Sequence, residues 1–253
     1  MSVPLALLHG FCGAPESWRR VVELLGPPAG GTPVARPALL GHDPAALHDD
    51  AVDFSGEVAR LGALLRAQAA GGWHLVGYSL GARVALGLLV EHPALFARAT
   101  LIGVHPGLRS DAERSSRIGQ DDRWARLLEA HGLEEFVRAW EAQPLFATQA
   151  ALPREIDEEQ RRIRLGHDAH GLARSLRVLG LGCMPDYAAR LAAVACSVRV
   201  VAGALDTKFS ALAAPLAAAL GNGRAEIVPE AGHNLLLERP RRVAELIREG
   251  SRA

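Results

Sequence analysis

The sequence predicts an α/β fold with a mostly parallel central sheet flanked by helices. Short apolar runs, typical of buried strands, alternate along the chain with longer segments that carry apolar residues at helical spacing. Such alternation is typical of a parallel sheet with helices on both faces. A length of 253 residues is enough for one such sheet and a sizeable insertion.

The alternation defines the elements in order, with Gly and Pro at their ends. The expected strands are residues 3–8, 33–40, 73–78, 99–104, 198–202 and 225–228. The expected helices are residues 17–25, 53–69, 80–90, 212–220 and 241–249.

One stretch, from Arg109 to Leu191, interrupts the alternation. It is rich in Arg, Glu, Leu and Ala and contains no clear strand run, so we expect several helices there. The chain therefore divides into a first core segment (1–108), a helical insertion (109–191) and a second core segment (192–253). Open α/β sheets bind ligands at the carboxyl ends of their strands, which predicts that the insertion caps an active site. The alternative is a second structural domain with no role in the site.

Charge and cysteine content exclude several classes of function. Lys plus Arg number 28 and Asp plus Glu number 28, so a zero net charge gives no electrostatic case for binding nucleic acid or an anionic membrane. Cys12, Cys183 and Cys196 lack the spacing of a zinc site or a disulfide framework, and we expect free thiols and no metal. We see no signal peptide and no apolar run near the roughly 20 residues of a membrane span, which predicts a cytoplasmic protein.

A nucleophile motif lies between an expected strand and an expected helix. Gly77-Tyr78-Ser79-Leu80-Gly81 matches G-x-S-x-G in the strand–turn–helix context that this motif requires. The turn is sharp, and glycine on either side avoids collisions with neighbouring backbone. Ser79 then lies at a helix N-terminus, where free N–H groups and the helix dipole favour negative charge. The motif predicts the α/β-hydrolase fold with Ser79 as nucleophile.

The base and the acid follow in the order expected for this fold. Asp206 comes directly after the strand at 198–202, and His233 lies in a loop between the last strand and the last helix. A carboxylate in that place can hold the imidazole tautomer and stabilise the imidazolium. Ser79, Asp206 and His233 are therefore the predicted catalytic triad.

Two backbone N–H groups are the predicted oxyanion hole. One belongs to Leu80, the residue after the nucleophile, and the other to Phe11 in the loop that follows the first strand. His9, in the same loop, is interpreted as a structural histidine that is hydrogen-bonded to backbone.

These motifs, together with others along the whole chain, resemble the family of 2-succinyl-6-hydroxy-2,4-cyclohexadiene-1-carboxylate synthases of menaquinone biosynthesis. The triad motifs fit many α/β-hydrolases, whereas Arg83, Gln143-Pro144-Leu145-Phe146 and Asp206-Thr207-Lys208-Phe209 are more selective. The further matching stretches are His9-Gly10-Phe11 with Gly13 and Trp18, His105-Pro106-Gly107-Leu108, Asp122-Arg123-Trp124, Trp140, Arg164 with Gly171-Leu172-Ala173, and Ala231-Gly232-His233-Asn234.

The resemblance implies a carbon–oxygen lyase. Members of the family eliminate pyruvate from 2-succinyl-5-enolpyruvyl-6-hydroxy-3-cyclohexene-1-carboxylate and leave the cyclohexadiene product. The serine, primed by the histidine, would act as base on a ring C–H, and the oxyanion hole would hold the charge that develops on the succinyl carbonyl. The reaction needs no acyl-enzyme and no cofactor.

A substrate with several carboxylates suits arginine, whose guanidinium binds carboxylates through two hydrogen bonds. Arg83 lies one helical turn beyond Ser79, and Arg123 and Arg164 lie in the predicted cap, so all three are substrate-binding candidates. The alternative is that they are solvated surface residues, as most arginines of the chain must be.

Two aromatic residues complete the predicted substrate site. Trp140 could pack against a ring or belong to the core of the cap, and Tyr78 could donate a hydrogen bond or fill space. Glu141 departs from the family, which often has tyrosine there, and its carboxylate would repel an anionic substrate unless it faces away. Ala82 in place of a usual glycine and Cys12 beside the oxyanion loop are milder departures.

Two other functions remain open from the sequence. A carboxylic-ester or C–C bond hydrolase would use the same triad, but a neutral ester would not need three convergent arginines. A non-catalytic ligand receptor on this fold would have no use for an intact triad. The sequence makes no prediction of the oligomeric state.

Overall fold

A parallel sheet forms the centre of the computed structural model, which describes residues 3–27, 29–43 and 53–250. In the described residues the sheet has six strands in the order β2-β1-β3-β4-β5-β6, and every neighbouring pair is parallel. The predicted parallel sheet is thus confirmed. The strands are β1 (Leu5–Leu8), β2 (Val34–Ala35), β3 (Trp73–Tyr78), β4 (Phe96–Ile102), β5 (Ser197–Gly203) and β6 (Gly223–Val228).

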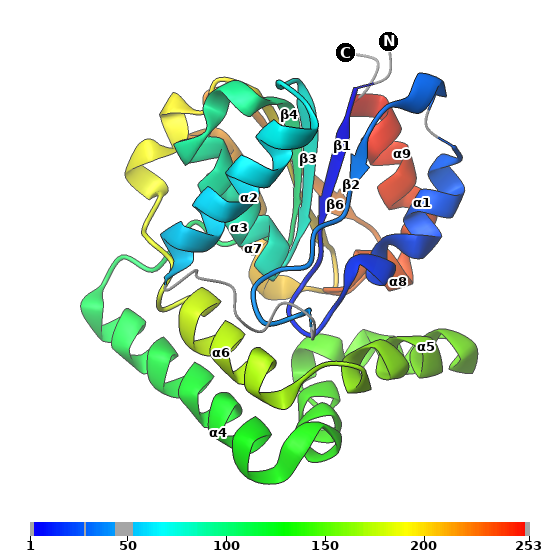
Figure 1. The fold of residues 1–253 in the computed structure, drawn as a ribbon, viewed down its shortest axis with the longest axis vertical. Helices are drawn as coiled ribbons and strands as arrows, with labels where there is room; N and C mark the ends of the chain where they lie inside the picture. Colours follow the sequence, from blue (N-terminus) through cyan, green and yellow to red (C-terminus); the bar gives the residue numbers. More distant parts are fainter. Residues whose placement is uncertain (1–2, 28, 44–52, 251–253) are drawn as a thin grey trace.

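Helices cover the two faces of the sheet and one of its ends (Figure 1). The α-helices are α1 (Arg19–Leu25), α2 (Phe54–Gln68), α3 (Leu80–Glu91), α4 (Asp111–Glu141), α5 (Arg154–Leu165), α6 (Ala169–Leu179), α7 (Thr207–Ala219), α8 (Leu235–Glu238) and α9 (Pro240–Gly250). Short 3-10 helices are η1 (Pro15–Trp18), η2 (Ala29–Gly31), η4 (Pro93–Leu95), η5 (Pro144–Ala151) and η6 (Ala188–Ala193). No helix in the described ranges is long and apolar enough to cross a membrane.

Strands β1 and β3, inside the sheet, are apolar on both sides because each side faces a separate layer of helices. Every residue of β1 and β3 is buried. Within β3, Leu75 belongs to the apolar cluster under α2, α3 and α7, whereas Val76 belongs to the cluster under α1, α8 and α9. Successive side chains of a strand point to opposite faces, so a doubly covered strand has an unbroken apolar sequence.

The two largest differences from the predicted element boundaries have local reasons. The second strand, expected over 33–40, is limited to Val34–Ala35. Pro37 lies two residues further on and has no N–H to donate to a sheet ladder. Helix α7, expected from residue 212, begins at Thr207 because Asp206 caps it, its side chain accepting a hydrogen bond from the backbone N–H of Phe209.

Helices α4, α5 and α6 lie between β4 and β5 in the chain and are placed at the end of the sheet where the strands finish (Figure 1). Their apolar side chains form a cluster of their own, which includes Leu128, Phe136 and Leu172. Cys12, from the loop after β1, is buried in the same cluster. The helical insertion is therefore packed directly on a loop that leaves the sheet.

Close backbone packing after β5 and β6 brings two functional loops together. The N–H of Leu205 donates to the carbonyl of Ala231 at 2.8 Å, and that of Ala204 donates to Val228 at 2.9 Å. A side chain at Gly203 would collide with the backbone oxygens of Ala231 and Gly232. Glycine at 203 thus allows the two loops to approach each other.

Gly203→Ala should lower the free energy of unfolding by about 2 kcal/mol, because an added methyl in a packed interior forces backbone to move. The matched control is Gly119→Ala in α4, where an added Cβ would have no neighbour closer than Arg123 Nη1 at 4.0 Å. That control should be neutral or stabilise the protein by up to about 1 kcal/mol, since alanine favours helix. Urea unfolding measures both variants, and equal stabilities would contradict the packing argument.

Candidate active site

The turn between β3 and α3 holds Ser79 in a strained backbone conformation. Ser79 has φ 53° and ψ −110°, a backbone conformation that residues other than glycine rarely adopt. Its N–H donates to the carbonyl of Ile102 at 2.8 Å, which ties the turn to β4. A Cβ on Gly77 would lie 2.5 Å from the carbonyl oxygen of Gly81, and one on Gly81 would collide with the carbonyl of Leu8. Both glycines of the motif are therefore required by backbone packing.

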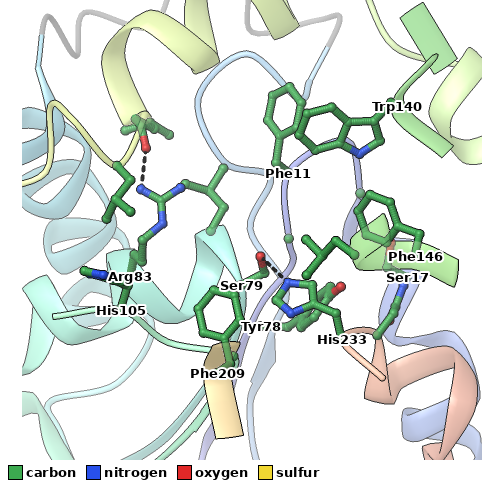
Figure 2. Close-up of a pocket in the computed structure, with 18 of the residues that line it drawn as sticks. Phe11, Ser17, Tyr78, Ser79, Arg83, His105, Trp140, Phe146, Phe209 and His233 are labelled. Carbon is green, nitrogen blue, oxygen red and sulfur yellow. Dashed lines mark hydrogen bonds between the residues drawn. The ribbon is translucent and has the colours of Figure 1, made fainter. Parts of the chain in front are cut away.

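Ser79, His233 and Asp206 form a continuous hydrogen-bonded chain. Nε2 of His233 is 3.0 Å from Oγ of Ser79 (Figure 2). Nδ1 of the same ring is 2.6 Å from Oδ2 of Asp206. Both the imidazole and the carboxylate are buried. The other carboxylate oxygen accepts the N–H of Phe209 at 3.2 Å, which orients the acid. The structure thus brings the three predicted residues into the geometry of a general base that activates a serine.

Room for the imidazole comes from a glycine in a left-handed conformation. Gly103, directly after β4, has φ +63°, and a Cβ there would lie 2.9 Å from Cε1 of His233. On its other side, His233 contacts the ring of Phe209, with 4.8 Å between centroids, and that of Tyr78, with 5.4 Å. The ring is held on several sides, so its position does not depend on the triad hydrogen bonds alone.

The two predicted oxyanion donors lie beside the nucleophile. Leu80 begins α3, where backbone N–H groups have no acceptor within the helix. Phe11 follows β1, and both residues line the cavity that contains Ser79. The next residue, Cys12, has φ 58° and donates its N–H to Nε2 of His42 at 3.0 Å. The loop that carries Phe11 is therefore fixed by a side chain from another segment.

His9 supports the same loop from beneath. Its Nε2 accepts the N–H of Leu39 at 3.2 Å, so Nδ1 carries the hydrogen that is donated to the carbonyl of Gly10 at 2.8 Å. Burial lowers the pKa of His9 to about 4, and the ring is neutral at physiological pH. Both ring nitrogens of His9 are therefore hydrogen-bonded to backbone, as the sequence analysis predicted.

The cavity that contains Ser79 is lined by residues of the core and of the insertion, with aromatic rings along one side (Figure 2). Trp140 lines it with centroids 5.1 Å from the ring of Phe11 and 6.0 Å from that of Phe146. Trp140 also stacks on Phe136 in the core of the insertion, with centroids 5.5 Å apart. Trp140 therefore belongs to the core of the insertion and also lines the cavity. Tyr78 lines the cavity as well, and burial raises the pKa of its hydroxyl.

Arg83 lies on the opposite side of the cavity, next to His105 (Figure 2). Its Nη1 donates to the carbonyl of Leu179 at 2.7 Å, which directs the guanidinium towards α6. Burial, with a smaller contribution from Arg117, lowers the pKa of Arg83 to about 9, so the group is still cationic at neutral pH. Since an arginine turned towards a cavity needs an anion to offset its desolvation, this side suits a negatively charged group.

Arg164, the second predicted arginine, reaches the cavity from α5 with a side chain that is only 3% exposed. Its Nη1 donates to Oε1 of Glu141 at 2.8 Å, and its guanidinium lies 5.6 Å from the centre of the Phe146 ring. Glu141 also accepts from Arg161 at 2.5 Å. Two guanidinium groups therefore offset the one carboxylate, which orients Arg164 and does not act as an unpaired negative charge.

Arg123, the third predicted arginine, is exposed and is not among the residues that line the cavity, so the structure does not bring it together with Arg83 and Arg164. The arginine of α4 that lines the cavity is Arg117. The two positions are six residues apart on α4, about 240° around the helix, so they face different directions. Arg117 is held by Asp121, whose carboxylate oxygens are 2.9 and 3.0 Å from its Nε. The i,i+4 spacing of this pair is the sequence signal that could have identified it.

His105 and Lys208 also line the cavity beside these arginines. Both lie in stretches that carry the family resemblance, but the sequence analysis did not predict them as site residues. His105 follows β4 as Asp206 follows β5, and that position at a strand end could have identified it. Its Nδ1 accepts the N–H of Gly107 at 3.1 Å, and burial lowers its pKa to about 4, with further contributions from nearby cations. Among the described residues, no group of three or more His, Cys, Asp or Glu side chains is arranged to hold a metal ion.

Comparison with known proteins finds similarity over nearly the whole chain. A family model described as the alpha/beta hydrolase family matches residues 5–246, which confirms the predicted fold class. A 2-succinyl-6-hydroxy-2,4-cyclohexadiene-1-carboxylate synthase from Enterobacter sp. (strain 638) is 34% identical, covering 95% of this chain and 88% of the relative. One from Escherichia coli O1:K1 / APEC is 32% identical, covering 93% and 88%. The solved structure of MenH from S. aureus superposes with a TM-score of 0.89 at 28% identity, covering 98% of this chain and 92% of that one.

A fluorophosphonate probe, which phosphonylates activated serines, should label Ser79. Ser79→Ala should abolish labelling, and Asp206→Asn should slow it by about 10³-fold, because the imidazole loses the group that holds its tautomer. Ser175→Ala, which removes another serine of the cavity wall, is the control and should label normally. Intact-mass spectrometry over time measures the rates, and equal rates for the wild type and Asp206→Asn would contradict the triad.

Acid should destabilise the fold through His9. The unfolded chain binds a proton near pH 6.5 whereas the folded ring resists protonation until about pH 4, so stability falls as the pH drops through this window. At pH 5 this effect of His9 lowers the free energy of unfolding by about 2 kcal/mol relative to neutral pH. His9→Asn should therefore lose about that much less stability than the wild type between pH 7.5 and pH 5. Urea unfolding at several pH values measures this, with the exposed His131→Asn as control, and parallel curves for His9→Asn and the wild type would refute it.

Proposed function

The chain belongs to the α/β-hydrolase family and, within it, to the 2-succinyl-6-hydroxy-2,4-cyclohexadiene-1-carboxylate synthases, and from this premise we propose how it works. It is a carbon–oxygen lyase of menaquinone biosynthesis. Its substrate is the small molecule 2-succinyl-5-enolpyruvyl-6-hydroxy-3-cyclohexene-1-carboxylate, from which it eliminates pyruvate. Ser79, His233 and Asp206 carry out the proton transfer, and the cationic residues of the cavity bind the carboxylates.

The observation that carries the proposal is the convergence of Arg83, Arg117 and Arg164 on the cavity that contains Ser79. They come from α3, α4 and α5, so only the folded chain brings them together. A neutral ester gives no reason for three guanidinium groups in one cavity, whereas a substrate with three carboxylates does. Each guanidinium already has one partner in the protein, which fixes its direction before a ligand binds.

The reaction follows from the hydrogen-bonded chain. Nε2 of His233 takes the proton of the Ser79 hydroxyl as Oγ removes the ring proton next to the succinyl carbonyl. The electron pair moves onto the carbonyl oxygen, where the N–H groups of Phe11 and Leu80 stabilise the negative charge. It then moves through the ring double bond and breaks the C–O bond to the enolpyruvyl group. That group leaves as the enolate and is protonated to pyruvate, so the proton lost by the ring is balanced.

Asp206 acts by stabilising the imidazolium that forms during proton transfer. Its Oδ2 lies 2.6 Å from Nδ1 of His233, and the surrounding apolar side chains exclude water from this pair. In such surroundings the attraction between carboxylate and imidazolium is stronger than in water. The aromatic side of the cavity, with Phe11, Trp140 and Phe146, would pack against the substrate ring.

We further propose that residues 109–191 act as the cap of this active site. They supply Arg117 from α4, Arg164 from α5, and the aromatic rings of Trp140 and Phe146. A purely structural domain would not contribute charged side chains to the cavity of the nucleophile. The core segments, 1–108 and 192–253, supply the triad, the oxyanion donors and Arg83.

Pyruvate release from the enolpyruvyl precursor, generated in situ, tests the proposal. The wild type should release pyruvate rapidly, and Ser79→Ala should lose at least about 10³-fold in kcat/KM because no group takes the ring proton. Arg83→Ala and Arg117→Met should each lose about 10- to 100-fold through a missing carboxylate contact. Arg123→Met, which removes the exposed arginine of the same helix, is the matched control and should retain wild-type activity.

A wild type that releases no pyruvate above the uncatalysed rate would overturn the lyase proposal. The same triad would then be tested on carboxylic esters and on C–C bond substrates. Equal losses in Arg117→Met and Arg123→Met would instead contradict the assignment of the α4 arginine.

A further inference from the structure

Lys208 is the only lysine among the 253 residues, and the other 27 basic residues of the 28 are arginines. It is the second residue of α7, two positions after the triad acid Asp206, and it lines the cavity of Ser79. Its ammonium lies 5.5 Å from the centre of the Phe209 ring, which itself packs on His233. The one amine side chain of the chain is therefore placed at the active site.

The surroundings of Lys208 are cationic. The charges of Arg117 and Arg83 act on its ammonium and, after burial, lower its pKa, whereas Asp206 acts in the opposite direction. The charges of Lys208, Arg83 and Arg117 likewise contribute to lowering the pKa of His105. Four elements contribute to this part of the wall: α3, the segment after β4, α4 and α7.

The nearby carboxylates are already engaged. Asp121 is bonded to Arg117, and Asp206 is bonded to His233 and to the N–H of Phe209. Within the described part of the chain, the ammonium of Lys208 has neither a hydrogen-bond nor an ion-pair partner. Three cations face two carboxylates, and both carboxylates are already bonded to other groups. This leaves excess positive charge in a partly desolvated wall, which an incoming anion would offset.

We propose that Lys208 binds a carboxylate of the substrate and, with Arg83 and Arg117, determines specificity for anionic arms. The inference rests on the proposed function. Lysine suits the task because its compact charge lies on a flexible stem and can follow a mobile arm, whereas an arginine fork requires one fixed orientation. Two arms of the substrate end in a carboxylate: the succinyl arm, a 4-oxo acid, and the enolpyruvyl arm that leaves as pyruvate.

The first test uses the single lysine as a reporter and needs no catalytic turnover. N-hydroxysuccinimidyl acetate, a neutral reagent, should acetylate Lys208 and the chain's α-amine, and peptide mass spectrometry separates the two. Levulinate mimics the succinyl arm, and pyruvate is the leaving group. Protection of Lys208, but not of the α-amine, by one of them supports the proposal and identifies the arm. Failure of both to protect Lys208, or no acetylation of Lys208, overturns it.

The second test measures substrate recognition. Lys208→Met should raise KM by about tenfold or more with a smaller change in kcat, and Lys208→Arg, which keeps the charge, should restore most of the loss. Arg123→Met is again the control for removing a distant positive charge. Unchanged KM in Lys208→Met would overturn the assignment. If the wild type released no pyruvate, the proposed function would fail, while the protection result would still decide whether Lys208 binds carboxylates.

Discussion

The strained turn at Ser79 is the constraint on which the rest of the site depends. A positive φ at a residue with a side chain costs free energy, of the order of 1–3 kcal/mol, and persists only where the surrounding structure enforces it. Here the enforcement comes from both neighbouring strands: the turn hydrogen-bonds to β4 and packs against the end of β1. The same packing sets the oxyanion loop beside the nucleophile, so the position of the catalytic groups follows from close backbone contact at the end of the sheet.

Charge in this protein is balanced overall and concentrated locally. The formal net charge is zero, yet Arg83, Arg117, Arg164 and Lys208 all line one cavity. The protein holds its arginines with partners that leave part of each guanidinium available: a carbonyl for Arg83 and carboxylates for Arg117 and Arg164. Glu141 shows how an acid near the cavity can be useful, because its paired carboxylate orients the guanidinium of Arg164.

The insertion and the core depend on each other at the loop after β1. Cys12 is buried in the apolar cluster of the insertion, and its N–H is held by His42. Phe11, one residue earlier, places its ring against Trp140 and lines the cavity that contains Ser79. One short loop thus connects packing in the insertion with the geometry of the oxyanion donors, a consequence of ordering the helices over the carboxyl ends of the strands.

The sequence by itself determined the sheet and identified Ser79, His233 and Asp206, which the structure joins by hydrogen bonds, because these signals are local. A strand that is buried on both faces is recognisable from its apolar run. The two glycines of G-x-S-x-G are recognisable because any larger residue there would collide with neighbouring backbone. Our prediction misplaced the end of the second strand and the start of α7, although the residues that decide them, Pro37 and the helix cap Asp206, lie in the sequence itself. Only the tertiary structure decided which arginines meet: Arg117 faces the cavity and Arg123 faces solvent because of their angle around α4. Charges brought together from separate helices leave no local pattern, so convergence of this kind is settled by packing alone.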